Sequence, residues 1–123
     1  LKELIDKALL KPFTMADFFE LLEAIKSKEL PKQIYGTIGI RKLLSSENPP
    51  IQPVIDAQLV STLIEYMQRE DVPHLQLEST WAITNIASGT SQQLQSIVDK
   101  GGIPILLKLL RSAKDIAEQA VWA

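Results

Sequence analysis

The chain has 123 residues, 46% of them hydrophobic and 23% charged, with 13 basic and 15 acidic side chains. This composition excludes a disordered or low-complexity chain, and the net charge of −2 argues against a nucleic-acid-binding surface, which needs a strongly basic face. The absence of cysteine excludes disulfides and thiolate metal sites. No apolar run approaches the roughly 20 residues of a membrane helix, so we expect no membrane partner.

The chain opens with a segment, residues 1–14, in which Leu1, Leu4 and Ile5 are spaced as on one face of a helix. It has neither an initiator Met nor the layout of a signal peptide. We expect a leading helix that acts as a partial cap, and we expect both ends of the sequence to be cuts in a longer protein.

From residue 15 onward, apolar residues recur at helical spacing, and no stretch keeps the alternation of a strand. Helix breakers divide this pattern into segments of about 8 to 15 residues joined by short turns. The breakers lie at Pro12, Pro31, Pro49-Pro50, Pro73, Gly89 and Gly101-Gly102. We therefore predict an all-α fold with about eight or nine helices.

The helical segments repeat. Residues 54–60 align with residues 97–103 at an offset of 43, which places Asp56 on Asp99. Trp81 falls on Trp122 at an offset of 41, and residues 38–45 fall on residues 81–88 as a first copy without the tryptophan. A period of about 40 to 47 residues, with two or three helices a unit, is typical of armadillo and HEAT repeats.

The period predicts a right-handed armadillo-type solenoid of about three repeats, at residues 15–48, 49–89 and 90–123, the last one truncated. In the middle copy we expect helices at about 50–57, 59–69 and 73–88. One unit cannot bury its apolar stripe alone, so neighbouring copies should share a continuous core. The core residues expected from the middle copy are Leu63, Ile64, Met67, Leu75, Leu77, Ile83 and Ile86.

Residues 75–91, LQLESTWAITNIASGTS, resemble the third helix and following turn of an importin-α armadillo repeat. Two further segments, at residues 41–51 and 118–123, are similar to that family in the same order, and the similarity covers about residues 15–123. The resemblance implies a nuclear import adaptor, present in the cytoplasm and the nucleus, whose third helices line a concave groove. Its expected partners are cargo proteins with basic nuclear-localisation signals, and importin-β through a segment outside this sequence.

By the same resemblance, peptide-binding roles fall on Trp81, Asn85, Ser88, Gly89, Thr90, Gln119 and Trp122. Trp81 and Asn85 are four residues apart, so they share one helix face. An Asn amide can hold a peptide main chain as donor and acceptor. Trp81 and Trp122 could form the walls of a slot for a Lys side chain, with about 0.5–2 kcal/mol of cation–π attraction for each contact.

The sequence departs from the family pattern at three places. Leu94 stands where a Thr usually lines the main Lys pocket, and Ser46 stands where an Arg is common. The Asn and acidic residues that should follow Trp122 lie beyond the end of the sequence. The Lys pocket is therefore expected to be incomplete, and binding to be weaker than that of a full array.

Several of these residues also have simpler interpretations. Trp81 could be a core residue, Asn85 could bond a neighbouring backbone carbonyl, and Gly89 could end a helix in the left-handed conformation. The only histidine, His74, is expected to be a solvated first-turn residue. The acidic residues Glu78, Asp115 and Glu118 are expected on a solvated face.

No motif for catalysis, phosphate binding or a metal site occurs, so we expect no enzyme activity and no cofactor. Two alternatives to the import adaptor remain open: an armadillo-type interaction scaffold that does not bind localisation signals, and an accessory domain of an enzyme. Apolar faces at the two ends of the array should promote self-association. The residues expected on these faces are Leu4, Leu9, Phe18, Phe19, Ile103, Leu107 and Val121.

Overall fold

The computed structural model describes the backbone of residues 1–122 and the side chains of residues 1–120. Within that range every regular element is helical, which confirms the predicted all-α fold. The elements are α1 (Lys2–Leu10), a 3₁₀ turn η1 (Met15–Asp17), α2 (Phe18–Ile25), α3 (Leu30–Leu44), α4 (Ile51–Asp56), α5 (Leu59–Met67), α6 (Pro73–Ala87), α7 (Ser91–Asp99), α8 (Gly102–Arg111) and α9 (Ala113–Trp122).

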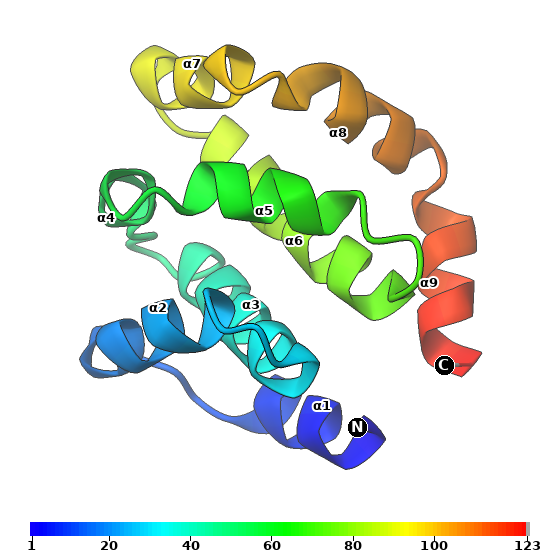
Figure 1. Cartoon of the computed structure of the whole chain (residues 1–123). Coiled ribbons are helices and arrows are strands. Elements are labelled where there is room, and N and C mark those ends of the chain that lie inside the picture. The colour runs from blue at the N-terminus through cyan, green and yellow to red at the C-terminus, as the bar shows by residue number, and fades with distance from the viewer. Residues whose placement is uncertain (123) are drawn as a thin grey trace.

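The helices form sets of three that stack on one another, as Figure 1 shows. The sets are η1–α2–α3, α4–α5–α6 and α7–α8–α9, and they fall within the proposed repeats 15–48, 49–89 and 90–123. The third helices pack side by side, α3 against α6 and α6 against α9, while α2 and α5 pack against α3 and α6 respectively. The stack is an armadillo solenoid, as the period predicted.

The backbone follows the 43-residue offset even where the side chains differ. Gln58, before α5, and Gly101, before α8, both adopt the left-handed conformation, with φ of 62° and 72°. This conformation costs an L residue about 1–2 kcal/mol but is open to glycine. A Gln in this position indicates that packing of the two flanking helices enforces the turn. The helix bounds of the middle repeat lie within two residues of the predicted ones.

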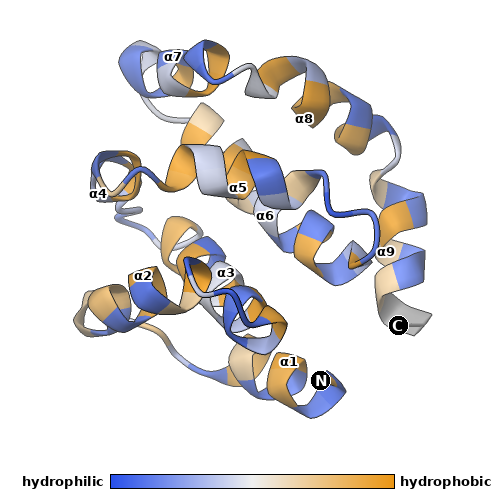
Figure 2. Cartoon of the chain, in the orientation of Figure 1, coloured by the Kyte–Doolittle hydropathy of each residue, from blue (hydrophilic) through white to orange (hydrophobic). Residues whose placement is uncertain are grey.

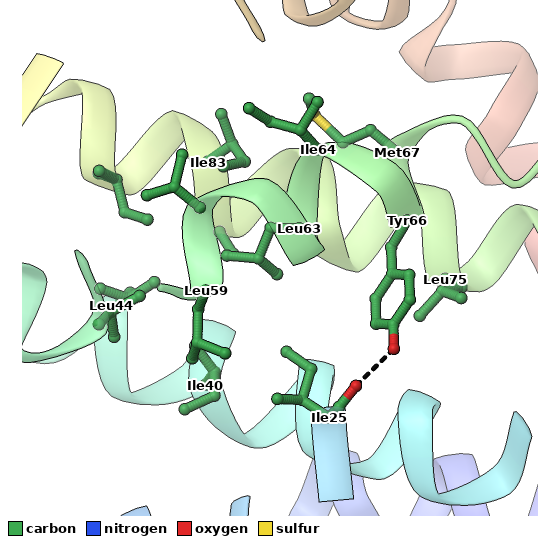
Figure 3. Close-up of a cluster of buried hydrophobic side chains, with 14 of the residues drawn as sticks. Ile25, Ile40, Leu44, Leu59, Leu63, Ile64, Tyr66, Met67, Leu75 and Ile83 are labelled. Atoms are coloured by element: carbon green, nitrogen blue, oxygen red, sulfur yellow. Dashed lines mark hydrogen bonds between the residues drawn. The ribbon is translucent and has the colours of Figure 1, made fainter. Parts of the chain in front are cut away.

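A continuous hydrophobic core runs through the stack, and Figure 2 shows helices with one apolar and one polar side. Six of the seven predicted core residues are buried, and Leu77 is partly buried. Figure 3 shows buried residues of the first two repeats in one cluster, which includes Ile40 of α3 and Leu59 of α5, and the Tyr66 hydroxyl donates a hydrogen bond to the Ile25 carbonyl. That bond ties α5 to the end of α2.

The leading segment forms a helix, α1, which packs against α3. Lys42 of α3 holds its carboxyl end, because Nζ donates hydrogen bonds to the carbonyl oxygens of Leu9 at 2.6 Å and Lys11 at 2.5 Å. A cation in this position satisfies carbonyls that have no partner within the helix and compensates the negative end of the helix dipole. The helix α1 is therefore fixed to α3, the third helix of the first repeat.

The expectation of exposed apolar faces holds for Phe19, 81% exposed, and for Leu107, 49% exposed. It is wrong for Leu4, Leu9, Phe18 and Ile103, which are partly buried against the core. The side chain of Val121 lies outside the described residues. Among the described helices, none combines the length and the apolarity needed to cross a membrane.

Candidate functional site

Trp81 and Asn85 lie one turn apart on α6, the middle of the three stacked third helices. Trp81 is 46% exposed, so its interpretation as a core residue is wrong. Asn85 is partly buried, and its Nδ2 donates to the Ser45 hydroxyl at the end of α3, at 3.1 Å. The amide thus bonds a side chain of the preceding repeat rather than a backbone carbonyl, which corrects that alternative as well.

Ser45 is part of the same arrangement, since its hydroxyl donates to the Arg41 carbonyl at 3.0 Å. The bonds from Asn85 to Ser45 and from Ser45 to α3 fix the side of the amide that faces the first repeat. Within residues 1–120 the Asn85 Oδ1 accepts no hydrogen bond. An extended backbone passing over α6 could donate to that oxygen.

The turn after α6 carries Ser88, Gly89 and Thr90, all of which are exposed. The Ser88 hydroxyl donates to the Asn85 carbonyl at 2.6 Å. Thr90 caps α7: its Oγ1 accepts from the Gln93 backbone N–H at 3.2 Å, and Gln93 Oε1 accepts from the Thr90 N–H at 2.9 Å. The turn at the carboxyl end of α6 is therefore held by its own hydrogen bonds.

Gly89 does not have the left-handed conformation that we considered for it. A Cβ at this position would lie 2.2 Å from Gln93 Oε1 and 3.1 Å from Ile51 Cδ1. A larger residue here would displace the amide end of the Gln93 side chain, which caps α7, so glycine leaves that cap undisturbed.

The remaining predicted residues belong to the third repeat. Gln119 is exposed on α9. The side chain of Trp122 lies outside the described residues, so the structure leaves its pairing with Trp81 untested. Of the two departures from the family pattern, Leu94 is exposed on α7, and Ser46 is exposed beyond the end of α3.

A buried ion pair, which sequence reasoning missed, joins α3 to α6. Arg41 donates from Nε to Glu78 Oε1 at 2.6 Å and from Nη2 to Glu78 Oε2 at 3.3 Å. Glu78 is only 3% exposed, so its expected place on a solvated face is wrong. Asp115 and Glu118 are exposed, as expected.

His74 lies one turn before Glu78 on α6, with Nε2 3.6 Å from Glu78 Oε2. Its ring nitrogen is buried and its side chain is largely covered, so the expectation of a solvated residue is wrong. Burial by itself raises the pKa of Glu78, but the nearby His74 ring and the hydrogen-bonded Arg41 guanidinium outweigh it and hold that pKa below its ordinary value. Glu78 is therefore ionised at neutral pH.

The sequence carried a signal for a buried charge but none for its partner. Arg41 stands in the largely apolar stretch Ile38–Leu44, and a charge that becomes buried there needs an opposite charge. At the 43-residue offset Arg41 falls on Thr84 and Glu78 on Tyr35, so the repeat does not pair the two residues. Spacing along one helix does not reveal such a partner, because the two residues are 37 positions apart.

A largely apolar hollow of about 430 Å³ lies near the amino-terminal ends of α3 and α6, between α1 and α9. Ile5, Ile34 and Leu77 are among its lining residues. Leu77 precedes Trp81 by one turn of α6, so the hollow adjoins the strip of α6 that carries Trp81 and Asn85. Its apolar walls do not suit an ammonium group, and the Lys slot expected beside Trp81 is a separate feature.

Among the described residues, no group of three His, Asp or Glu side chains is placed to hold a metal ion. The helix α6 presents the exposed indole of Trp81 and the side-chain amide of Asn85, whose oxygen is an unused acceptor. The Arg41–Glu78 ion pair lies against that indole and carries no net charge. Such a surface can hold an extended chain and a cationic side chain by non-covalent contacts.

Stacked three-helix units whose third helices share one layer define an armadillo solenoid. Residues 41–88 and 90–123 match the family model described as Armadillo/beta-catenin-like repeat. Importin subunit alpha-1b of Oryza sativa subsp. japonica is 48% identical over 105 residues, which are 84% of this chain and 20% of that protein. The chain belongs to the armadillo-repeat family, and its repeats are of the importin subunit alpha type.

Two other relatives agree with this assignment. Importin subunit alpha-2 of Arabidopsis thaliana is 46% identical over 105 residues, which are 84% of this chain and 20% of that protein. Importin subunit alpha of Saccharomyces cerevisiae is 40% identical over 102 residues, which are 81% of this chain and 19% of that protein. The chain thus spans about a fifth of the length of the curated relatives it matches.

Proposed function

We propose that this chain is part of a nuclear import adaptor and binds extended basic peptides of the nuclear-localisation type along its third helices. The observation that carries the proposal is the pair on α6: an indole that is 46% exposed and, one turn further on, an Asn amide with an unused acceptor. The importin alpha relatives support the same role. The chain acts by binding and not by catalysis.

The peptide lies across the third helices, and each repeat contacts it at intervals set by helix spacing. Neighbouring helices are about 8–10 Å apart and an extended chain advances about 3.3 Å a residue. One Asn per repeat thus meets the peptide backbone every two or three residues. Asn85 holds the main chain without reading its sequence, while Trp81 attracts a Lys stem and its ammonium group.

The other residues of the proposed site have supporting roles. Ser88, Gly89 and Thr90 frame the end of α6 towards the bound peptide, and Gln119 and Trp122 continue the strip on the third repeat. Leu94 supplies no hydroxyl to the ammonium of the main Lys residue. Affinity is therefore micromolar or weaker, because few clamps are present and each contributes only about 0.5–2 kcal/mol.

The partners of the intact protein would be cargo proteins with basic signals, and importin-β through a segment outside this chain. The intact protein would move between cytoplasm and nucleus. The competing proposal is an armadillo scaffold that does not recognise localisation signals. It predicts no preference for Lys over Ala in a bound peptide.

Titration of a fluorescent peptide with a Lys-Lys-x-Lys core, against a peptide with Ala in place of one Lys, separates the two proposals. Trp81→Ala should abolish the preference for Lys, whereas Asn85→Ala should weaken both peptides by a similar factor of about 2 to 10. Phe19→Ala is the matched control, since Phe19 is an exposed aromatic residue on α2 and not on a third helix. If neither substitution on α6 changes binding, the groove assignment is wrong.

A further inference from the structure

The guanidinium of Arg41 is held more rigidly than an ordinary surface charge. Its two hydrogen bonds to Glu78, at 2.6 and 3.3 Å, grip the carboxylate along one edge of the guanidinium plane. Arg41 is 8% exposed although it carries a full charge. A two-point contact of this kind sets both the position and the tilt of the group.

That rigid plane lies against the indole of the proposed peptide site. The Arg41 Cζ is 4.0 Å from the centroid of the Trp81 ring. Arg41 belongs to α3, so the covered face of the indole is the one on the side of the first repeat. Trp81 nonetheless keeps nearly half of its surface exposed, and that exposed surface is what a guest can reach.

The first repeat offers no second aromatic wall on that side. Ile38 stands at the position equivalent to Trp81 and is fully buried. Between α3 and α6, Arg41 of the chain itself fills the space next to the Trp81 indole. The carboxylate of Glu78 neutralises that residue, so a second cation near Trp81 meets a pair with no net charge.

We infer that Arg41 is a specificity-determining positioning residue: a built-in cation that fixes the Trp81 indole and fills its α3-side face. Peptide cations then stack only on the face turned away from α3. The row of Lys slots therefore ends at Trp81, and it continues only in the direction of α9. This inference rests on the peptide-binding function proposed above, and it specifies the helix at which the row of Lys slots ends.

A purely structural role for Arg41, as a strut between two repeats, is the competing explanation. A strut would affect every peptide alike, because its loss shifts the helices. A positioning residue affects the Lys preference alone, because main-chain contacts made by Asn85 do not pass through the indole.

The affinity measurement uses the whole chain with Trp122 retained, and the fluorescence measurement uses Trp122→Phe, which leaves Trp81 as the single tryptophan. In each background Arg41→Met with Glu78→Gln removes both charges at similar volume, a change that folded proteins tolerate better than loss of one partner. The matched control is Arg69→Met with Asp71→Asn, which removes the two-point ion pair at the start of α6. Circular dichroism verifies that both variants are folded.

The first readout needs no peptide. Acrylamide quenching of Trp81 fluorescence should rise in the Arg41→Met/Glu78→Gln variant, since a flexible Met side chain lacks the two hydrogen bonds that hold Arg41 against the ring. It should stay constant in the Arg69→Met/Asp71→Asn variant. Arg41→Lys should give an intermediate value, because an ammonium cannot keep both the edge-on pair and the stack.

The second readout is the ratio of affinities for the Lys and Ala peptides. We expect the ratio to fall about threefold or more in the Arg41→Met/Glu78→Gln variant while affinity for the Ala peptide stays constant. Unchanged quenching and an unchanged ratio would overturn the inference and leave the proposed function intact. An equal loss for both peptides would also overturn it, in favour of the strut. Absence of any Lys preference in the chain with both Trp81 and Trp122 present would refute the proposed function, and the specificity role with it.

Discussion

The close approach of α2 and α3 can be tested at a single position, Gly36. A Cβ there would lie 2.4 Å from the backbone nitrogen of Ile25 and 2.8 Å from its Cα. Backbone atoms cannot rotate aside, so Gly36→Ala must push the two helices apart. This matters for the site because α3 carries Arg41 and Ser45.

The expected magnitude is the difference of two effects. Replacing a mid-helix Gly by Ala gains about 1 kcal/mol of helix propensity, and overpacking a well-filled contact costs about 1–3 kcal/mol or more. We expect a net loss of about 1–2 kcal/mol in the free energy of unfolding. For a chain of this length that lowers the melting temperature by about 3–10 °C.

Thermal unfolding followed by far-ultraviolet circular dichroism measures this effect. The control is Gly39→Ala on the same helix, where the three atoms nearest the new Cβ all belong to the side chain of Leu21, with Cδ2 at 2.3 Å. Both variants gain the same propensity, but a side chain can adjust where a backbone cannot, so Gly39→Ala should lose less stability. A Gly36→Ala protein as stable as the wild type would refute the close approach of the two helices.

Three further predictions concern other contacts. Tyr66→Phe removes the hydrogen bond to the Ile25 carbonyl and should lower the free energy of unfolding in urea by about 0.5–1.5 kcal/mol. The lowered pKa of Glu78 means that its contribution to stability is complete above its unfolded-state value of 4.5 and is lost as pH falls through the folded-state value. As pH falls below 4.5, the free energy of unfolding measured in urea should therefore decrease more steeply for the wild type than for Arg41→Met/Glu78→Gln. Leu107→Gln should reduce self-association in a sedimentation concentration series, because Leu107 is an exposed apolar residue of α8.

Each of the three has an outcome that contradicts it. Tyr35→Phe is the control for the first prediction, since the Tyr35 hydroxyl accepts a solvent-exposed hydrogen bond from Lys11. An equal loss of unfolding free energy in both variants would show that the buried Tyr66 bond stabilises the fold no more than an exposed one. Equal acid sensitivity of wild type and the charge-free pair would remove Glu78 from the explanation. A wild-type chain that stays monomeric at high micromolar concentration would show that its exposed apolar residues do not drive association.

The repeat architecture could be predicted because it is written in local patterns. Periodic apolar residues, prolines at the starts of α3 and α6, and a shared offset fix the helices of each copy. The shared face of Trp81 and Asn85 follows from their four-residue spacing, whereas the exposed position of Trp81 was indicated only by the resemblance to the family. The left-handed turn at Gln58 was not predictable from its residue type and is visible only through its counterpart Gly101.

The contacts between repeats could not be predicted in the same way. Glu78 looks like a surface residue on α6 until Arg41 of another helix is placed beside it. His74 is covered because it packs next to that pair, and Asn85 bonds Ser45 across a similar distance along the chain. These contacts depend on how the third helices are stacked, and a sequence pattern within one helix carries no information on them.

The central claim is that α6 presents Trp81 and Asn85 to a basic peptide. Nuclear magnetic resonance of the isotope-labelled chain tests it directly, through the indole N–H signal of Trp81 and the side-chain amide signals of Asn85. Addition of the Lys-Lys-x-Lys peptide should shift both sets of signals in a saturable way, and the Ala peptide should shift those of Asn85 more than that of Trp81. Signals of both residues that stay in place at peptide concentrations far above micromolar would contradict the account.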